Sequence, residues 1–134
     1  MATWNKFHAW AKNMVTVANL DTDQFTIALT NTAPVAANSV LADITEISYT
    51  NLTSRNITTT SSSQTGGVYT LVFQDLTLTA SGSVPSFRYV VIYDNTPTSP
   101  LDPVVSWFDY GSSITMANDQ TFTVDFTGAA ITLS

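Results

Sequence analysis

The chain has 134 residues and contains no cysteine, which excludes disulfide bonds and every site built on thiolate ligands, such as an iron–sulfur cluster. Charged residues are also scarce, at 10% of the sequence, against roughly 25% in typical soluble domains. Four basic residues face ten acidic ones, so the formal net charge is −6. Because nucleic acids and anionic membranes attract basic surfaces, we expect neither as a partner.

Residues that commonly carry catalysis are equally sparse. Histidine occurs once, as His8, and glutamate once, as Glu46. One histidine cannot build a histidine-rich metal site, and the sequence contains neither a G-x-S-x-G nucleophile elbow nor a glycine-rich phosphate loop. The sequence therefore predicts a non-enzymatic protein with no catalytic residues, no metal site and no cofactor.

Two alternatives involving the aspartates stay open. A glycan hydrolase needs a pair of carboxyl groups in a cleft, for which Asp94, Asp102 and Asp109 are the candidates. Asp21 and Asp23, together with those residues, also have the oxygen ligands that a structural calcium ion prefers. Turn formation by aspartate side chains is the simpler explanation for most of them.

Hydrophobic residues make up 44% of the sequence, enough for a packed core, and the length suits a single domain over residues 1–134. The apolar runs are too short to span a bilayer. Polarity comes largely from hydroxyl groups, with 23 threonines and 14 serines. Such a surface favours broad contacts with other proteins, because little charge must be desolvated on association.

Apolar residues near the N-terminus recur at spacings of three and four, which predicts a helix over residues 4–18. The residues that set this period are Trp4, Phe7, Ala11, Met14 and Ala18. His8 would lie beside the apolar stripe, as a partly buried helix residue. Two tryptophans and a phenylalanine in the first ten residues must cover either the rest of the domain or a neighbouring subunit.

From residue 24 onward the hydrophobic period changes to two, which indicates strands. The phase of the alternation slips at Gln74-Asp75, where a bulge or sharp bend is expected. Residues 87–93 are apolar on both phases, as in a strand that is central or covered on both faces. The pattern predicts a mainly β fold: an antiparallel, jelly-roll-like β-sandwich over residues 24–134, preceded by one N-terminal helix.

Residues 58–65 form a low-complexity stretch that precedes Gly66-Gly67. We expect an exposed loop or hairpin tip here, which orders against a partner in one alternative. This loop and the N-terminal aromatic residues are the candidate partner-binding segments. The residues predicted to bind a partner are Trp4, Phe7, Trp10, Ser61, Ser62, Ser63 and Gln64.

Four segments carry a family resemblance: ALTNTAP (28–34), LADITEI (41–47), FRYVVIYD (87–94) and WFDYGSSIT (107–115). Together with the opening MATWNKFHAWAKNMV, they resemble a family of small structural proteins from tailed bacteriophages and prophages, over nearly the whole chain. The resemblance implies a virion component that is made in the bacterial host cytoplasm. The first role that the resemblance implies is that of a capsid decoration or cement protein. Its partners would be the major capsid protein and further copies of itself, with which it would form a dimer or trimer.

Two other functions fit the same features. One is a neck, head–tail joining or tail component that assembles into a ring. The other is a host-facing module that binds glycans through aromatic side chains and the serine- and threonine-rich loop. The aromatic residues available for a glycan platform are Trp4, Trp10, Trp107, Tyr89, Tyr93 and Tyr110.

Overall fold

The computed structural model describes residues 4–126 and 131–133, and in this part of the chain the fold is mainly β. The strands belong to three antiparallel groups. The largest group has, in spatial order, β1 (Asn5–Lys6), β7 (Val104–Met116), β6 (Val84–Asp94) and β2 (Phe25–Thr30). The second has β3 (Thr59–Thr65), β4 (Val68–Phe73) and β9 (Ile131–Leu133), and the third has β5 (Leu76–Thr79) and β8 (Thr121–Val124).

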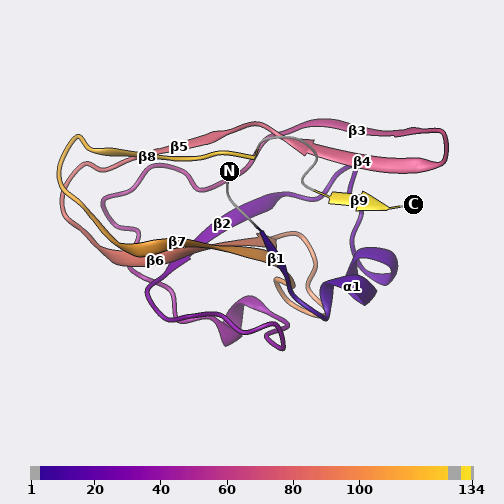
Figure 1. Ribbon diagram of the computed structural model, residues 1–134, viewed down its shortest axis with the longest axis horizontal. Coiled ribbons are helices and arrows are strands. Elements are labelled where there is room, and N and C mark those ends of the chain that lie inside the picture. Colours follow the sequence, from indigo (N-terminus) through magenta and orange to yellow (C-terminus); the bar gives the residue numbers. More distant parts are fainter. Residues whose placement is uncertain (1–3, 127–130, 134) are drawn as a thin grey trace.

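The groups stack in a sandwich-like arrangement, as Figure 1 shows. The β3-β4-β9 and β5-β8 groups lie end to end in one layer, and the four-stranded sheet forms the other. The chain passes from β4 to β5 at Gln74-Asp75, where the hydrophobic phase slips, so the bend expected there coincides with the passage between the two groups. The mainly β prediction with antiparallel sheets and one helix near the N-terminus is confirmed.

The main core fills the space between the two layers. Phe25, Ile27 and Leu29 of β2 point into it, as their alternation predicts. Strand β6 is buried on both faces, because Val90 and Ile92 join this core while Val91 and Tyr93 join a second cluster on the opposite face of the sheet. Residues around the 3₁₀ turn η1 (Leu41–Asp43) cover that second cluster.

The N-terminal segment differs from the prediction. The helix α1 spans Trp10–Thr16 rather than residues 4–18, and Asn5–Lys6 form β1, which pairs with Ser106 and Trp107 of β7. Side chains three residues apart share a face of a helix but lie on opposite faces of an extended chain. Trp4 accordingly packs against Phe108 in the main core region, whereas Phe7 packs in the second cluster. Pairing with the edge of β7 therefore overrides the helical spacing of the aromatic residues.

His8 also differs from its expected place. It lies in the turn before α1 and is exposed, not partly buried on a helix. No helix in the described ranges is long and apolar enough to cross a membrane.

Candidate functional site

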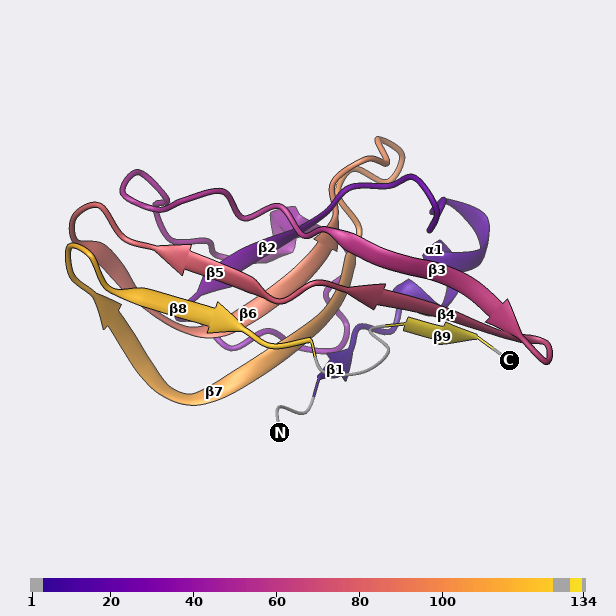
Figure 2. The same ribbon diagram turned by 90° about the horizontal axis from the view of Figure 1, so that it is seen from above.

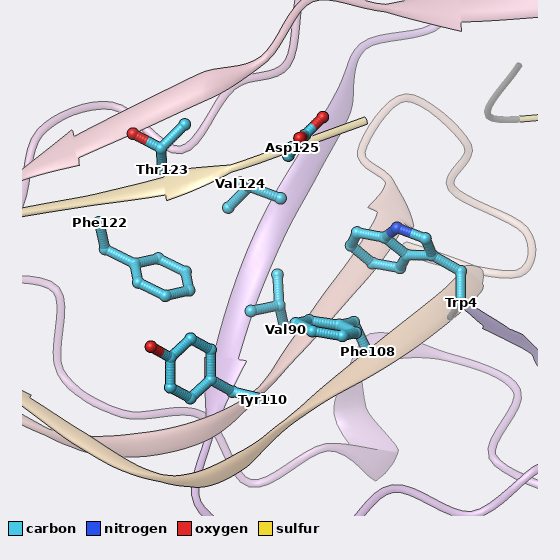
Figure 3. Close-up of a pocket in the computed structure, with 8 residues that line it drawn as sticks. All are labelled: Trp4, Val90, Phe108, Tyr110, Phe122, Thr123, Val124 and Asp125. Carbon is cyan, nitrogen blue, oxygen red and sulfur yellow. The ribbon is translucent and has the colours of Figure 1, made fainter. Parts of the chain in front are cut away.

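An apolar cleft opens between β7 and β8, at one side of the sandwich (Figure 3). Its volume is about 180 Å³. Phe108 and Tyr110 of β7 face Phe122 and Val124 of β8 across it, because alternate residues of a strand share a face. The remaining lining residues are Trp4, which precedes β1, Val90 of β6, and Thr123 and Asp125. The cleft thus brings the aromatic side chain of the N-terminal Trp4 together with those of β7 and β8, two consecutive strands near the other end of the chain.

Contacts between rings hold the walls of the cleft in place. The ring of Trp4 lies 5.8 Å from that of Phe108, and the ring of Tyr110 lies 5.7 Å from that of Phe122. Phe122 also meets the buried Phe87 edge to face, with the centroids 5.2 Å apart. Aromatic pairs at such distances attract one another beyond the effect of buried area. Tyr110 nevertheless remains 50% exposed, so one wall of the cleft is accessible from outside.

The interior of the cleft is apolar. In Figure 3 the side chains of Thr123 and Asp125 point away from the cavity, on the opposite face of β8. Cavities of roughly 150 Å³ with apolar linings accept a benzene-sized molecule. The cleft is therefore suited to bind one apolar group of that size, such as a ring or a branched aliphatic side chain.

The structure corrects the predicted role of the N-terminal aromatic residues. Phe7 is 0% exposed and Trp10 is 2% exposed, so both belong to the core and present no surface to a partner. Trp4 is half-buried and lines the cleft. Of the three, Trp4 alone is placed where it can contact a partner. Phe7 and Trp10 cover the chain's own sheets, which agrees with the alternative that these aromatic residues pack against the rest of the domain.

The segment expected to form an exposed loop or a hairpin tip is part of a β-hairpin, in which most of it forms strand β3. Ser61, Ser62, Ser63 and Gln64 lie in β3, which pairs with β4 through a turn at Gly66 and Gly67. Both glycines have positive φ angles, +60° and +85°, the conformation that a two-residue hairpin turn requires. Within β3, Ser62 is half-buried and its hydroxyl lies 2.7 Å from the Tyr69 hydroxyl, whereas the other three predicted residues are exposed. None of these four lines the aromatic cleft, so the two predicted segments do not form one site.

Sequence reasoning missed two of the aromatic residues that line the cleft, Phe108 and Phe122. Each sits in an alternating strand, where an aromatic residue is usually interpreted as core. What makes them part of a cleft is that β7 and β8 belong to different groups and are not paired with each other. A sequence pattern does not show that relation.

The three aspartates that the hydrolase alternative would use occupy different environments. Asp109 is exposed and forms an ion pair with Arg88 at 2.8 Å, and this contact lowers the pKa of its carboxyl group. Asp102 is half-buried, and burial raises its pKa. It lines a separate hollow together with Glu46. Among residues 4–126 and 131–133, no group of three or more His, Cys, Asp or Glu side chains is placed to hold a metal ion.

Asp94, the third candidate, is fully buried at the end of β6. Its Oδ1 accepts a hydrogen bond from the backbone N–H of Thr96 at 3.3 Å, while its Oδ2 has no hydrogen-bond partner. Burial, and next to it the nearby carboxyl group of Asp23, raise the pKa of Asp94 to about 8. A buried carboxyl group of this kind favours its protonated form and has no exposed surface with which to meet a substrate.

The raised pKa of Asp94 makes stability depend on pH. Because the folded state holds this proton more tightly than the unfolded state does, the stabilisation is complete below about pH 4 and is lost as pH rises toward 8. Asp94→Asn keeps an acceptor for Thr96 but carries no charge. We expect the variant to gain on the order of 2 kcal/mol in free energy of unfolding at pH 8 and almost nothing at pH 4.

Urea denaturation at the two pH values measures this difference. Asp109→Asn serves as the control, because its carboxyl group is exposed and ion-paired, and it is expected to show no gain at pH 8. An equal effect of Asp94→Asn at both pH values would contradict the burial of a titrating carboxyl group at this position.

Neither models of known protein families, nor curated proteins, nor solved structures match this chain. The features on which a function can rest are therefore the aromatic cleft, the exposed surface of the two layers and the resemblance carried by the sequence.

Proposed function

We propose that the chain is a non-enzymatic structural protein of a tailed-bacteriophage virion, and specifically a capsid decoration protein that bridges major capsid subunits. The aromatic cleft is the observation that carries this proposal, because it is a preformed apolar cleft with room for one apolar group. The low content of charge, 10% of the residues, supports it, since contacts around the cleft require little desolvation of charge. The resemblance of the sequence to small phage structural proteins supplies the virion context.

In this proposal an apolar side chain of a capsid subunit enters the cleft between Trp4 and Tyr110. Aromatic residues in such pockets act as anchors that dominate the energy of an interface. A protein that binds the assembled shell, and not its separated subunits, stabilises the shell by linkage. Many identical contacts over the shell then add up through avidity. The site of action is the virion, after synthesis in the host cytoplasm.

A neck or tail component would use the same cleft on a different partner, and the position of bound copies on the particle distinguishes the two. Glycan binding is the second candidate, because aromatic rings that line a cleft can stack on a sugar. A sugar also needs polar groups that fix its hydroxyls. The side chains of Thr123 and Asp125 point away from the cavity (Figure 3), which favours an apolar side chain as the occupant.

Adding the purified chain to phage particles that lack it tests the proposal. We expect saturable binding to the heads in co-sedimentation, and a higher temperature of DNA release from the decorated particles. Binding to the tail alone would favour the neck or tail alternative. Binding to host glycans but not to particles would contradict a structural role.

A further inference from the structure

A second hollow lies next to Trp4, at the end of the sandwich where β1, α1 and β9 come together (Figure 2). We call it the lysine hollow, because Lys6 of β1 is the charged residue in its lining. Its volume is about 300 Å³, which is at the lower end of the range for small-molecule sites. It shares only Trp4 with the aromatic cleft among the described lining residues, so the two are separate places on the chain.

The strand register places two polar side chains in this hollow. Lys6 pairs with Ser106 of β7, and Ser106 pairs on its other side with Ile92 of β6. Residues directly opposite one another in antiparallel strands point to the same face of the sheet. Ile92 belongs to the main core between the two layers. Lys6 and Ser106 therefore lie on the inner face of the sheet, at its edge.

The rest of the lining is largely apolar. Trp4 comes two residues before Lys6 in an extended segment, so the two side chains share a face. Trp10 and Met14 lie four residues apart on α1 and share a face of that helix. Ile131 of β9 adds a further apolar side chain. An ammonium group and a hydroxyl group are thus combined with indole rings and a thioether, whose flexible chain adapts to the shape of a ligand.

The charge of Lys6 is not neutralised within the part of the chain that the structure describes. There, no acidic residue lines the hollow, and neither Lys6 nor Ser106 has a side-chain hydrogen bond or an ion pair. An inward-pointing charge on an edge strand also discourages pairing with other chains. That role needs neither a hollow nor a hydroxyl group beside the lysine. The combination fits an anionic ligand with an apolar body.

We propose that the lysine hollow binds a small amphipathic carboxylate, in which an apolar ring or short chain carries one carboxylate group. The Lys6 ammonium group and the Ser106 hydroxyl group donate hydrogen bonds to the carboxylate, and bonds of this charge-assisted kind are strong. The apolar part packs against Trp4 and Met14. Since a cavity of roughly 150 Å³ accepts benzene, a hollow of about 300 Å³ has room for a ring with a short chain.

This inference concerns the chain alone and does not rest on the virion assignment. Titration of the full chain with 3-phenylpropionate, and with the uncharged 3-phenylpropanol, tests it at neutral pH. The methionine methyl resonances report where the ligand binds, because Met14 lines the hollow, whereas Met116 is buried in β7 and does not. We expect the Met14 resonance to shift saturably and the Met116 resonance to stay in place. The carboxylate should bind about tenfold more tightly than the alcohol, as a charge-assisted hydrogen bond implies.

Lys6→Met removes the charge of the side chain and keeps its length. Lys6 is exposed, so we expect the fold to be retained, which circular dichroism checks. The variant should bind 3-phenylpropionate no more tightly than it binds 3-phenylpropanol. Lys12→Met is the matched control, because Lys12 is an exposed lysine of α1 that does not line the hollow. It should bind both compounds like the unmodified chain.

Three results would overturn the proposal. The first is a Met14 methyl resonance that neither compound shifts, because the hollow would then be empty of ligand. The second is equal affinity of the unmodified chain for the acid and the alcohol, which would mean that the hollow does not recognise a carboxylate. The third is a Lys6→Met variant that still prefers the acid about tenfold, because another group would then hold the carboxylate.

Discussion

Replacing Phe7 by alanine is expected to lower the free energy of unfolding by about 3–5 kcal/mol, the range for large aromatic side chains removed from a core. Phe7 is 0% exposed, and its ring lies 4.6 Å from the ring of Trp107. The cluster around it includes Ile44, Val91 and Val104, which lie on other segments and are fixed by the sheet. The cavity left by the substitution would therefore close only in part. Urea denaturation at neutral pH measures the effect.

Val15→Ala is the matched control. Val15 is an apolar residue of the same N-terminal region, but it is 67% exposed on α1. Its replacement should change stability by less than about 0.5 kcal/mol. If Phe7→Ala changed the free energy of unfolding as little as this control does, Phe7 would not be a core residue. The hypothesis that Phe7 contacts a partner would then be open again.

Replacing Tyr110 by alanine is expected to weaken binding to phage heads about 30-fold, which corresponds to a loss of about 2 kcal/mol, the lower limit for an interface hot spot. Tyr110 forms an accessible wall of the cleft and contacts Phe122. Half of its surface is already exposed in the free chain, so the cost in folding stability should stay below about 1 kcal/mol. Co-sedimentation with particles that lack the chain measures affinity, and circular dichroism confirms the fold.

Leu101→Ala provides the control for this experiment. Leu101 is likewise exposed and apolar, at 62%, but it lies in the loop between β6 and β7, outside the cleft. Its replacement should leave binding unchanged. Equal affinity of Tyr110→Ala and the unmodified chain would show that the cleft is not the binding site.

Much of the fold follows from local patterns in the sequence. The alternation of Phe25, Ile27 and Leu29 places β2 against the core, and the apolar character of both faces of residues 87–93 reflects a strand covered on both sides. The slip at Gln74-Asp75 marks the passage between two strand groups. These features depend on residues that are close in the sequence, where side-chain periodicity is informative.

The N-terminal segment could not be predicted in the same way. The spacing of Trp4, Phe7 and Trp10 fits a helix, but the free edge of β7 lies near enough in the folded chain to pair with Asn5 and Lys6. Pairing with a strand a hundred residues away is a tertiary effect, and it decides the conformation of a short segment whose own propensity is weak.

The candidate site depends on relations of the same kind. Of its residues, Trp4 was predicted to bind a partner and Tyr110 was named for a glycan platform, whereas Phe108 and Phe122 stood out only as strand residues. The cleft exists because β7 and β8 lie in different layers and leave a gap between their side chains (Figure 3). Strand order determines that gap, and a single sequence does not reveal strand order.

The number of copies of this chain in a purified virion, relative to the major capsid protein, tests the proposed function most directly. Quantitative mass spectrometry of intact particles gives the ratio. A capsid decoration protein should be present at a ratio near one or at a simple fraction of it. Complete absence of the chain from the particle would contradict a virion role, and a copy number that corresponds to a single ring would contradict decoration and place the chain at the neck or tail.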